Sequence, residues 1–192
     1  NETLIPHPTI AYTSPETTGA LSFTPLADQG GIATITVTAS DGLSTTAQTF
    51  QVTINAINDA PTLDAFNALV LDEDAGEQTV ALNGITSGAA NETQTLIVTA
   101  QSSNVLLIPH PTVVYTSPEI IGTLSFTPLA DQSGAATMTV TVTDGLSTTV
   151  RAFLVTVKPV NDAPTAADIS VATDENVPVN LTPFPTYAHD LA

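Results

Sequence analysis

Apolar and polar residues alternate with a period of two along several segments of this 192-residue chain. The segments 33–39 and 136–142 carry Ala, Ile, Met or Val at every second position, with Thr between them. The segments 21–24 and 50–54 also alternate, with Leu, Phe, Val or Ile at the apolar positions and Ser, Gln or Thr at the polar ones. Such alternation is typical of β-strands with one face in a core and the other in water, where β-branched Thr is well suited to the wet face. No segment has a helical period, so the chain is expected to be all-β.

Turn signals separate these segments, among them Asp-Gly, Gly-Gly, Ser-Pro and Asn-Asp-Ala-Pro. Seven short strands in about 100 residues are typical of an antiparallel Greek-key β-sandwich. The loops after the first and fifth strands should then lie at the pole where the chain leaves, and those after the second and sixth at the pole where it enters. The strands of the middle segment are predicted at 67–72, 77–84, 94–101, 112–116, 122–127, 135–143 and 150–158.

The chain also repeats itself. Residues 1–62 match residues 104–165 at a constant offset of 103, with 42 of the 62 positions identical. A weaker third copy begins after residue 165, where Asp174-Glu175 aligns with Asp72-Glu73. We therefore expect the C-terminal part of one sandwich over 1–62, a complete sandwich over 63–165, and the N-terminal part of another over 166–192. This organisation predicts a tandem array in which each repeat contacts mainly its neighbours, and it favours an excerpt from a longer periodic chain.

Charge narrows the choice of partners. The chain holds nineteen Asp and Glu against two Lys and Arg, for a net charge of −17. Such a chain cannot displace the counterions of a nucleic acid backbone, and docking on anionic lipid is disfavoured. No run of eighteen apolar residues is present, so membrane insertion is not expected. The acidic surface suits divalent cations instead.

Catalytic motifs are missing from the sequence. It contains no Cys, no Gly-x-Ser-x-Gly elbow, no phosphate-binding Gly-Lys loop and no His-Glu-x-x-His. His7 and His110 each lie between two prolines, where an extended backbone favours a structural role over acid–base chemistry. We therefore expect a protein that is not an enzyme and that has no catalytic residues.

Three strings of residues carry a resemblance to a known family. They are Leu124 to Gly134, Thr139 to Gly145, and Val160-Asn161-Asp162-Ala163-Pro164. Together they resemble the cadherin-like and immunoglobulin-like tandem repeats of large bacterial surface proteins and adhesins. The resemblance implies an extracellular, cell-surface location and a structural or adhesive role, as a spacer or stalk. It also implies calcium at the junctions between repeats.

The calcium ligands that the resemblance implies are acidic and amide side chains on either side of each junction. In repeat one and its linker they are Asp28, Asn58 and Asp59. In repeat two they are Asp72, Glu73, Asp74, Asn91, Glu92, Asp131 and Asp144, followed by Asn161 and Asp162 of the next linker. Calcium takes six to eight oxygen ligands, which carboxylates and Asn carbonyls can supply.

The sequence also departs from the cadherin pattern. Ala60 and Ala163 replace the second Asn of the cadherin linker, and each loss removes a ligand. Asp28, Asp131 and Asp144 also suit turns, because an Asp side chain can accept hydrogen bonds from the N–H groups of its own turn. A structural role for these acids therefore stays open beside the calcium role.

Two further functions remain open. One is a subunit of an extracellular filament or matrix, in which the 166–192 piece of one copy completes the 1–62 piece of the next by strand donation. The other is a carbohydrate-binding module, which the 5% aromatic content does not favour. The expected partners are neighbouring repeats or head-to-tail copies, and a cell-surface or matrix ligand. Asn1, Asn91 and Asn180 open glycosylation sequons.

Overall fold

The computed structural model describes residues 1–161 and 170–179, and its strands all lie between residues 9 and 158. Within these residues there is no helix, so none of them forms a helix that could cross a membrane. The strands are β1 (Thr9–Ala11), β2 (Ala20–Ser22), β3 (Gly31–Ser40), β4 (Thr45–Ile54), β5 (Leu69–Asp72), β6 (Gln78–Leu82), β7 (Ile97–Ser102), β8 (Thr112–Val114), β9 (Gly122–Phe126), β10 (Gly134–Thr143) and β11 (Thr148–Lys158).

Repeat two is a sandwich of two sheets. One sheet has the strand order β5-β11-β10-β7, and the other has the order β6-β9-β8. All pairs are antiparallel except β5 with β11, which run parallel. Each of the seven predicted strand ranges overlaps one of these strands, so the all-β sandwich prediction is confirmed.

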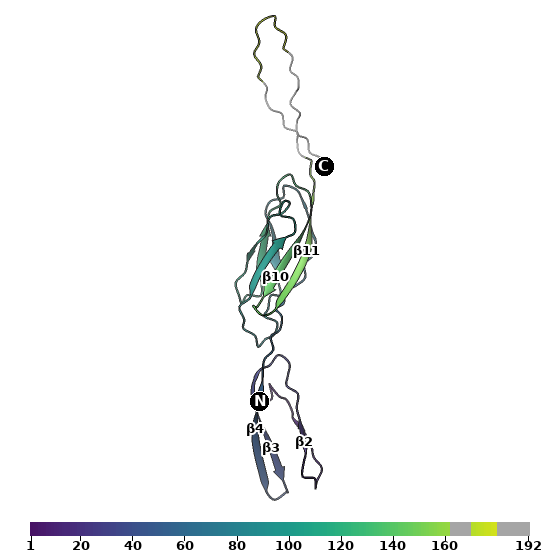
Figure 1. Ribbon diagram of the computed structural model, residues 1–192, viewed down its shortest axis with the longest axis vertical. Helices are drawn as coiled ribbons and strands as arrows, with labels where there is room; N and C mark the ends of the chain where they lie inside the picture. The colour runs from purple at the N-terminus through teal and green to yellow at the C-terminus, as the bar shows by residue number, and fades with distance from the viewer. Residues whose placement is uncertain (162–169, 180–192) are drawn as a thin grey trace.

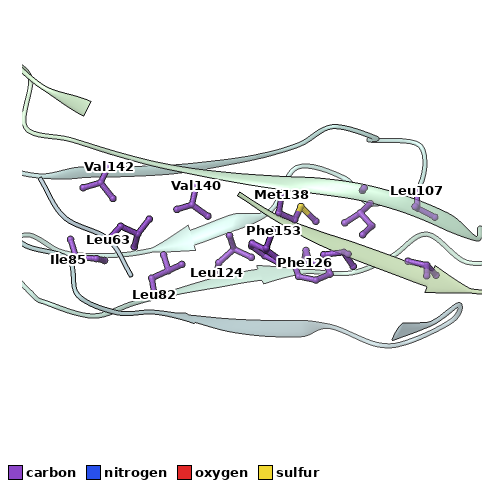
Figure 2. Packing of buried hydrophobic residues seen from close by; sticks show 14 of the residues in the cluster. Leu63, Leu82, Ile85, Leu107, Leu124, Phe126, Met138, Val140, Val142 and Phe153 are labelled. Carbon is purple, nitrogen blue, oxygen red and sulfur yellow. The ribbon is translucent and has the colours of Figure 1, made fainter. Parts of the chain in front are cut away.

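The core of repeat two follows directly from the alternation. In β10, Ala136, Met138, Val140 and Val142 are buried, while the Thr residues between them face outward. They pack against Leu82, Leu124, Phe126, Phe153 and Val155 from the other strands, as Figure 2 shows for most of them. Close packing of this kind fixes the orientation of both sheets, and with them the loops at each pole.

Repeat one has a smaller version of the same arrangement. Its two sheets are β1-β2 and β3-β4, which stand at the positions of β8-β9 and β10-β11. The buried cluster consists of four residues, Leu4, Ile5, Ala33 and Ile35. Leu21, Phe23, Val37, Val52 and Ile54 pack against it while staying partly exposed.

The two repeats lie end to end along the long axis of the molecule, with the linker around residues 55–62 between them (Figure 1). The sheets of repeat two bring its loops to two poles. The loops at 83–96 and 144–147 meet the incoming linker, and those at 73–77 and 127–133 lie where the chain leaves. The sandwich topology predicts this distribution of the loops between the two poles.

Candidate functional site: the joint between repeats one and two

The side chain of Asn58 makes several hydrogen bonds at the joint. Its side-chain amide donates to Asp144 Oδ2 at 3.1 Å, to Ser147 Oγ at 3.0 Å and to its neighbour's carbonyl, Asp59 O, at 3.1 Å. Its side-chain oxygen accepts from Gln94 Nε2 at 3.0 Å. One linker side chain is therefore hydrogen-bonded to two separate loops of repeat two.

Asp144 receives this linker from a turn that is already ordered. Its Oδ1 accepts from Leu146 N at 2.7 Å and from Ser147 N at 2.6 Å, and the residue is only 8% exposed. The pKa of Asp144 is lowered below its ordinary value of 3.8, chiefly by the Ser147 N–H, against an opposing effect of burial; the Leu146 N–H and the Asn58 amide lower it further. The N–H groups that donate to the carboxylate thus favour its charged form.

The next linker residue is bound through its backbone. Asp59 N donates to Glu92 Oε1 at 2.7 Å. Gly88 lies close beneath this segment, at φ +107°, where a Cβ atom would stand 2.6 Å from Ala60 O and 2.9 Å from Asp59 Cβ. Only Gly therefore allows the linker to approach so closely.

The end of the linker is bound as well. Pro61 is fully buried, and its carbonyl accepts a hydrogen bond from Thr149 Oγ1. Arg151 Nε donates to Leu63 O at 3.1 Å. The chain is consequently fixed to the entry pole of repeat two from Asn58 to Leu63.

Two side-chain oxygens at the joint are buried without a hydrogen bond. They are Glu92 Oε2 and Gln94 Oε1. The other terminal atom of each side chain, Glu92 Oε1 or Gln94 Nε2, makes one of the hydrogen bonds described above. Leaving a polar atom unpaired in this way costs about 1–3 kcal/mol unless water or an ion reaches it.

A second, smaller set of contacts lies at the exit pole. Glu73, 6% exposed, accepts from Val160 N at 2.7 Å through Oε1, and its own N donates to Lys158 O at 2.8 Å. Asp74 Oδ1 accepts from Asp131 N at 3.3 Å. The two loops predicted to meet at this pole therefore do meet, and Glu73 holds the start of the next linker.

Among the other residues implied as calcium ligands, Asn91 lines the same cleft at the joint as Asn58, Glu92 and Gln94. Asp28, Asp72 and Asn91 are exposed, and Asn161 begins the exit linker. Asp162 and Asn180 fall outside the described residues. Asp28 and Asp131 both have φ +55°, as expected of turn residues. Within residues 1–161 and 170–179, no three Asp, Glu or His side chains gather closely enough to share one metal ion.

Sequence reasoning missed Gln94, Ser147, Gly88 and Arg151. Arg151 offered one signal, because it is the only Arg of the chain and Gln48 stands at its position in repeat one. His110 is structural, since its Nδ1 accepts from Ser102 N at 3.1 Å.

Comparisons with known proteins agree with the architecture. The family model described as "Bacterial Ig domain" matches residues 58–157, which is more than half of the chain. No curated protein matches the sequence.

Solved structures match the chain at low sequence identity. Domains 4 and 5 of the S-layer protein SbsC have 18% identity and a TM-score of 0.36, over 72% of this chain and 62% of theirs. The titin domains Z1Z2 in complex with telethonin have 12% identity and a TM-score of 0.40, over 80% and 73%. An endo-fucoidan hydrolase of glycoside hydrolase family 107 has 18% identity and a TM-score of 0.39, over 81% of this chain and only 24% of the hydrolase.

The substitution Gly88→Ala should loosen the joint, because its Cβ would collide with the linker backbone and a residue with a side chain is strained at this φ. We expect it to lower the free energy of unfolding by about 2 kcal/mol in urea titrations. Gly76→Ala is the matched control, since Gly76 has open space around it. Equal stability of the two variants would contradict the close approach.

Lowering the pH should weaken repeat two through Asp144. Because its pKa is lowered in the folded state, its contribution is present above the ordinary value of 3.8 and is lost as the pH falls through the folded pKa. Urea midpoints should therefore fall between about pH 5 and pH 2, and Asp144→Asn should flatten that slope. Glu77→Gln, at an exposed position, controls for the loss of one charge. An unchanged slope in Asp144→Asn would refute the assignment.

Proposed function

Because the chain belongs to the bacterial Ig domain family, we propose that it is a non-enzymatic spacer of a bacterial surface protein, and that its joints are stiffened by hydrogen bonds between linker and repeat. The observation that supports this most directly is the Asn58 amide, which ties the linker to Asp144, Ser147 and Gln94 at once. A spacer must hold distance and direction, and it can do so only if its joints resist bending.

The composition of the linker supports the same function. The segment Asn58-Asp59-Ala60-Pro61-Thr62 has no Gly and contains a Pro, so it has little freedom even before docking. Docking restricts the conformational freedom of this segment further, because both the side chain of Asn58 and the carbonyl of Pro61 are bound to repeat two. Since Asn161-Asp162-Ala163-Pro164-Thr165 repeats this linker, the same device can recur along an array.

Calcium at the joints stays a prediction. A full calcium shell needs six to eight oxygens, whereas this joint leaves two buried side-chain oxygens unpaired, Glu92 Oε2 and Gln94 Oε1. The oxygens of Asp144 already accept hydrogen bonds from N–H groups. As arranged, these side chains fit direct hydrogen bonding better than they fit calcium.

Stiffness can be measured through the distance between spin labels on the two repeats. The chain has no Cys, so Gln48→Cys and Gln101→Cys, both at exposed strand positions, give unique attachment sites. We expect a narrow distance distribution that broadens with Asn58→Ala. Asn55→Ala, an exposed Asn at the start of the linker, is the matched control and should leave the distribution narrow.

The same labelled chain distinguishes a joint that is stiffened by hydrogen bonds from one that is stiffened by calcium. If hydrogen bonds hold the joint, the distribution has the same width in chelator and in millimolar calcium. A distribution that is broad in chelator and narrows only with calcium would contradict the proposal and would support a calcium-stiffened joint. A distribution that is broad under both conditions would exclude a stiff spacer.

A further inference from the structure

The charged side chains of this chain lie almost entirely outside its strands. Among the strands of the described residues, the charged positions are Asp72, Arg151 and Lys158 alone. The loops at the poles of repeat two hold Glu73, Asp74, Glu77 and Asp131 at the exit and Glu92 and Asp144 at the entry. The outer faces of the sheets are therefore nearly uncharged, in a chain of net charge −17.

One of these faces spans four strands. It is the outer side of the sheet β5-β11-β10-β7, and we call it the lateral face. Side chains that are opposite each other in neighbouring strands share a face, so the registers define its rows. From the exit pole to the entry pole, the rows are Val70 with Thr156 and Ala135, Leu154 with Thr137, Ala152 with Thr139 and Gln101, Val150 with Thr141 and Thr99, and Thr148 with Thr143 and Ile97. Asp72 and Lys158, which are register partners at the exit end, are the only charged residues of this sheet on that side.

The lateral face carries exposed aliphatic side chains. Val150, Ala152 and Leu154 form an apolar stripe along β11, in which Val150 is 51% exposed and Leu154 is 46% exposed. Val70 and Ile97 lie at the two ends of the face and are 55% and 58% exposed. Threonines occupy most of the remaining positions. A face that combines aliphatic side chains with hydroxyls and lacks charge is suited to contact with another protein surface.

Repeat one shows that the fold does not require this stripe. In β4, the counterpart of β11, residues 47, 49 and 51 are Ala, Thr and Gln, where the stripe has Val, Ala and Leu. On the inner side of the same strands, Phe50 and Val52 recur as Phe153 and Val155. Phe153 and Val155 belong to the buried core of repeat two, whereas the stripe does not. The apolar character of the stripe therefore needs an explanation outside the fold of repeat two.

The distribution of charge favours a second copy of the chain as the partner. Two chains of net charge −17 repel each other most strongly where their acids lie, and in repeat two that is at the poles. Contact through the lateral faces brings together the parts of two copies that carry the least charge. A basic partner would instead be attracted to the poles, where the carboxylates are concentrated.

The size of the lateral face sets the strength of such a contact. Four strands about 4.8 Å apart and five rows about 6.7 Å apart give roughly 600 Å² on each copy, or about 1,200 Å² in all. This total is at the lower limit for specific interfaces, so the contact should be weak. Many copies held side by side would strengthen it, because each chain then meets its neighbours at a high local concentration.

We propose that the lateral face of repeat two binds the lateral face of a second copy, so that two chains associate side by side. Such a contact sets the apolar stripe of one copy against the outer face of the other, with Ala152 near the centre. The contact lies between chains, whereas stiffness belongs to the joint within one chain, so either can fail without the other. It also differs from head-to-tail assembly, which joins the ends of the chains and leaves the lateral faces free.

Sedimentation equilibrium of the whole chain tests the proposal, from about 1 µM to about 1 mM protein. We expect a monomer–dimer equilibrium with a Kd on the order of 100 µM in about 0.15 M NaCl. The Kd should be smaller in about 1 M NaCl, because salt screens the repulsion between the acids. Leu154→Gln should raise the Kd at least about tenfold, because the dimer loses two apolar contacts. This variant should keep the fold, since Gln51 has the same place in the pairing of β3 with β4.

Ile121→Thr is the matched control and should leave the Kd unchanged. Ile121 is 59% exposed and has Thr18 as its counterpart, but it lies in the loop that leads into β9, which belongs to the other sheet. Cross-linking then locates the contact, because the chain has no Cys of its own. A short bismaleimide should link two copies of Ala152→Cys, but not two copies of Thr123→Cys, whose position is exposed on β9.

Three sedimentation results would overturn the proposal. They are a monomer at about 1 mM in both salts, a dimer that Leu154→Gln weakens no more than Ile121→Thr does, and a dimer whose Kd rises with salt. The last would indicate ion pairs between the poles of one copy and basic groups of the other. Cross-linking through Thr123→Cys alone would assign the contact to the sheet β6-β9-β8 and would equally refute the proposal.

Discussion

The hydrogen bond between the Asn58 amide and the Asp144 carboxylate is the contact on which the joint depends. It connects a linker residue to a turn at the far end of the β10–β11 pair, 86 residues later in the chain. The core of repeat two fixes that turn, so the rigidity of the sandwich is transmitted to the linker. The contacts of Asp59, Pro61 and Leu63 hold the segment that follows Asn58 against the same pole.

Hydrogen bonds to carboxylates also stabilise negative charge in a chain with few basic residues. With nineteen acids and two bases, the chain cannot pair most of its carboxylates with Lys or Arg. Asp41, Asp144 and Glu73 instead accept hydrogen bonds from backbone N–H groups, and the pKa values of the two aspartates are lowered as a result. Dipoles of ordered turns can thus stabilise negative charge where cations are missing. Asp144 and Glu73, which the resemblance implies as calcium ligands, accept hydrogen bonds from backbone N–H groups, and Asp144 also accepts one from the Asn58 amide.

Much of the fold was predictable because strand alternation, turn residues and an internal repeat all indicate the same sandwich. The poles were predictable too, since they follow from strand order alone. The partners of the acids were not, because a sequence gives the residue type but not the direction of its lone pairs. Glu73 illustrates this: the sequence gives a carboxylate near the exit pole, and only the structure shows that its Oε1 accepts the N–H of Val160. Gln94 and Gly88 gave no signal, since an amide and a glycine in a loop are common.

The central claim is that Asn58 and Asp144 hold the joint as a donor–acceptor pair. Reversing the pair tests it most directly. Asn58→Asp sets carboxylate against carboxylate, Asp144→Asn sets amide against amide, and the double variant restores one donor and one acceptor. The account predicts that urea unfolding of the double variant recovers at least about 1 kcal/mol relative to the sum of the single losses. Losses that simply add would contradict the account, because the two side chains would then act independently.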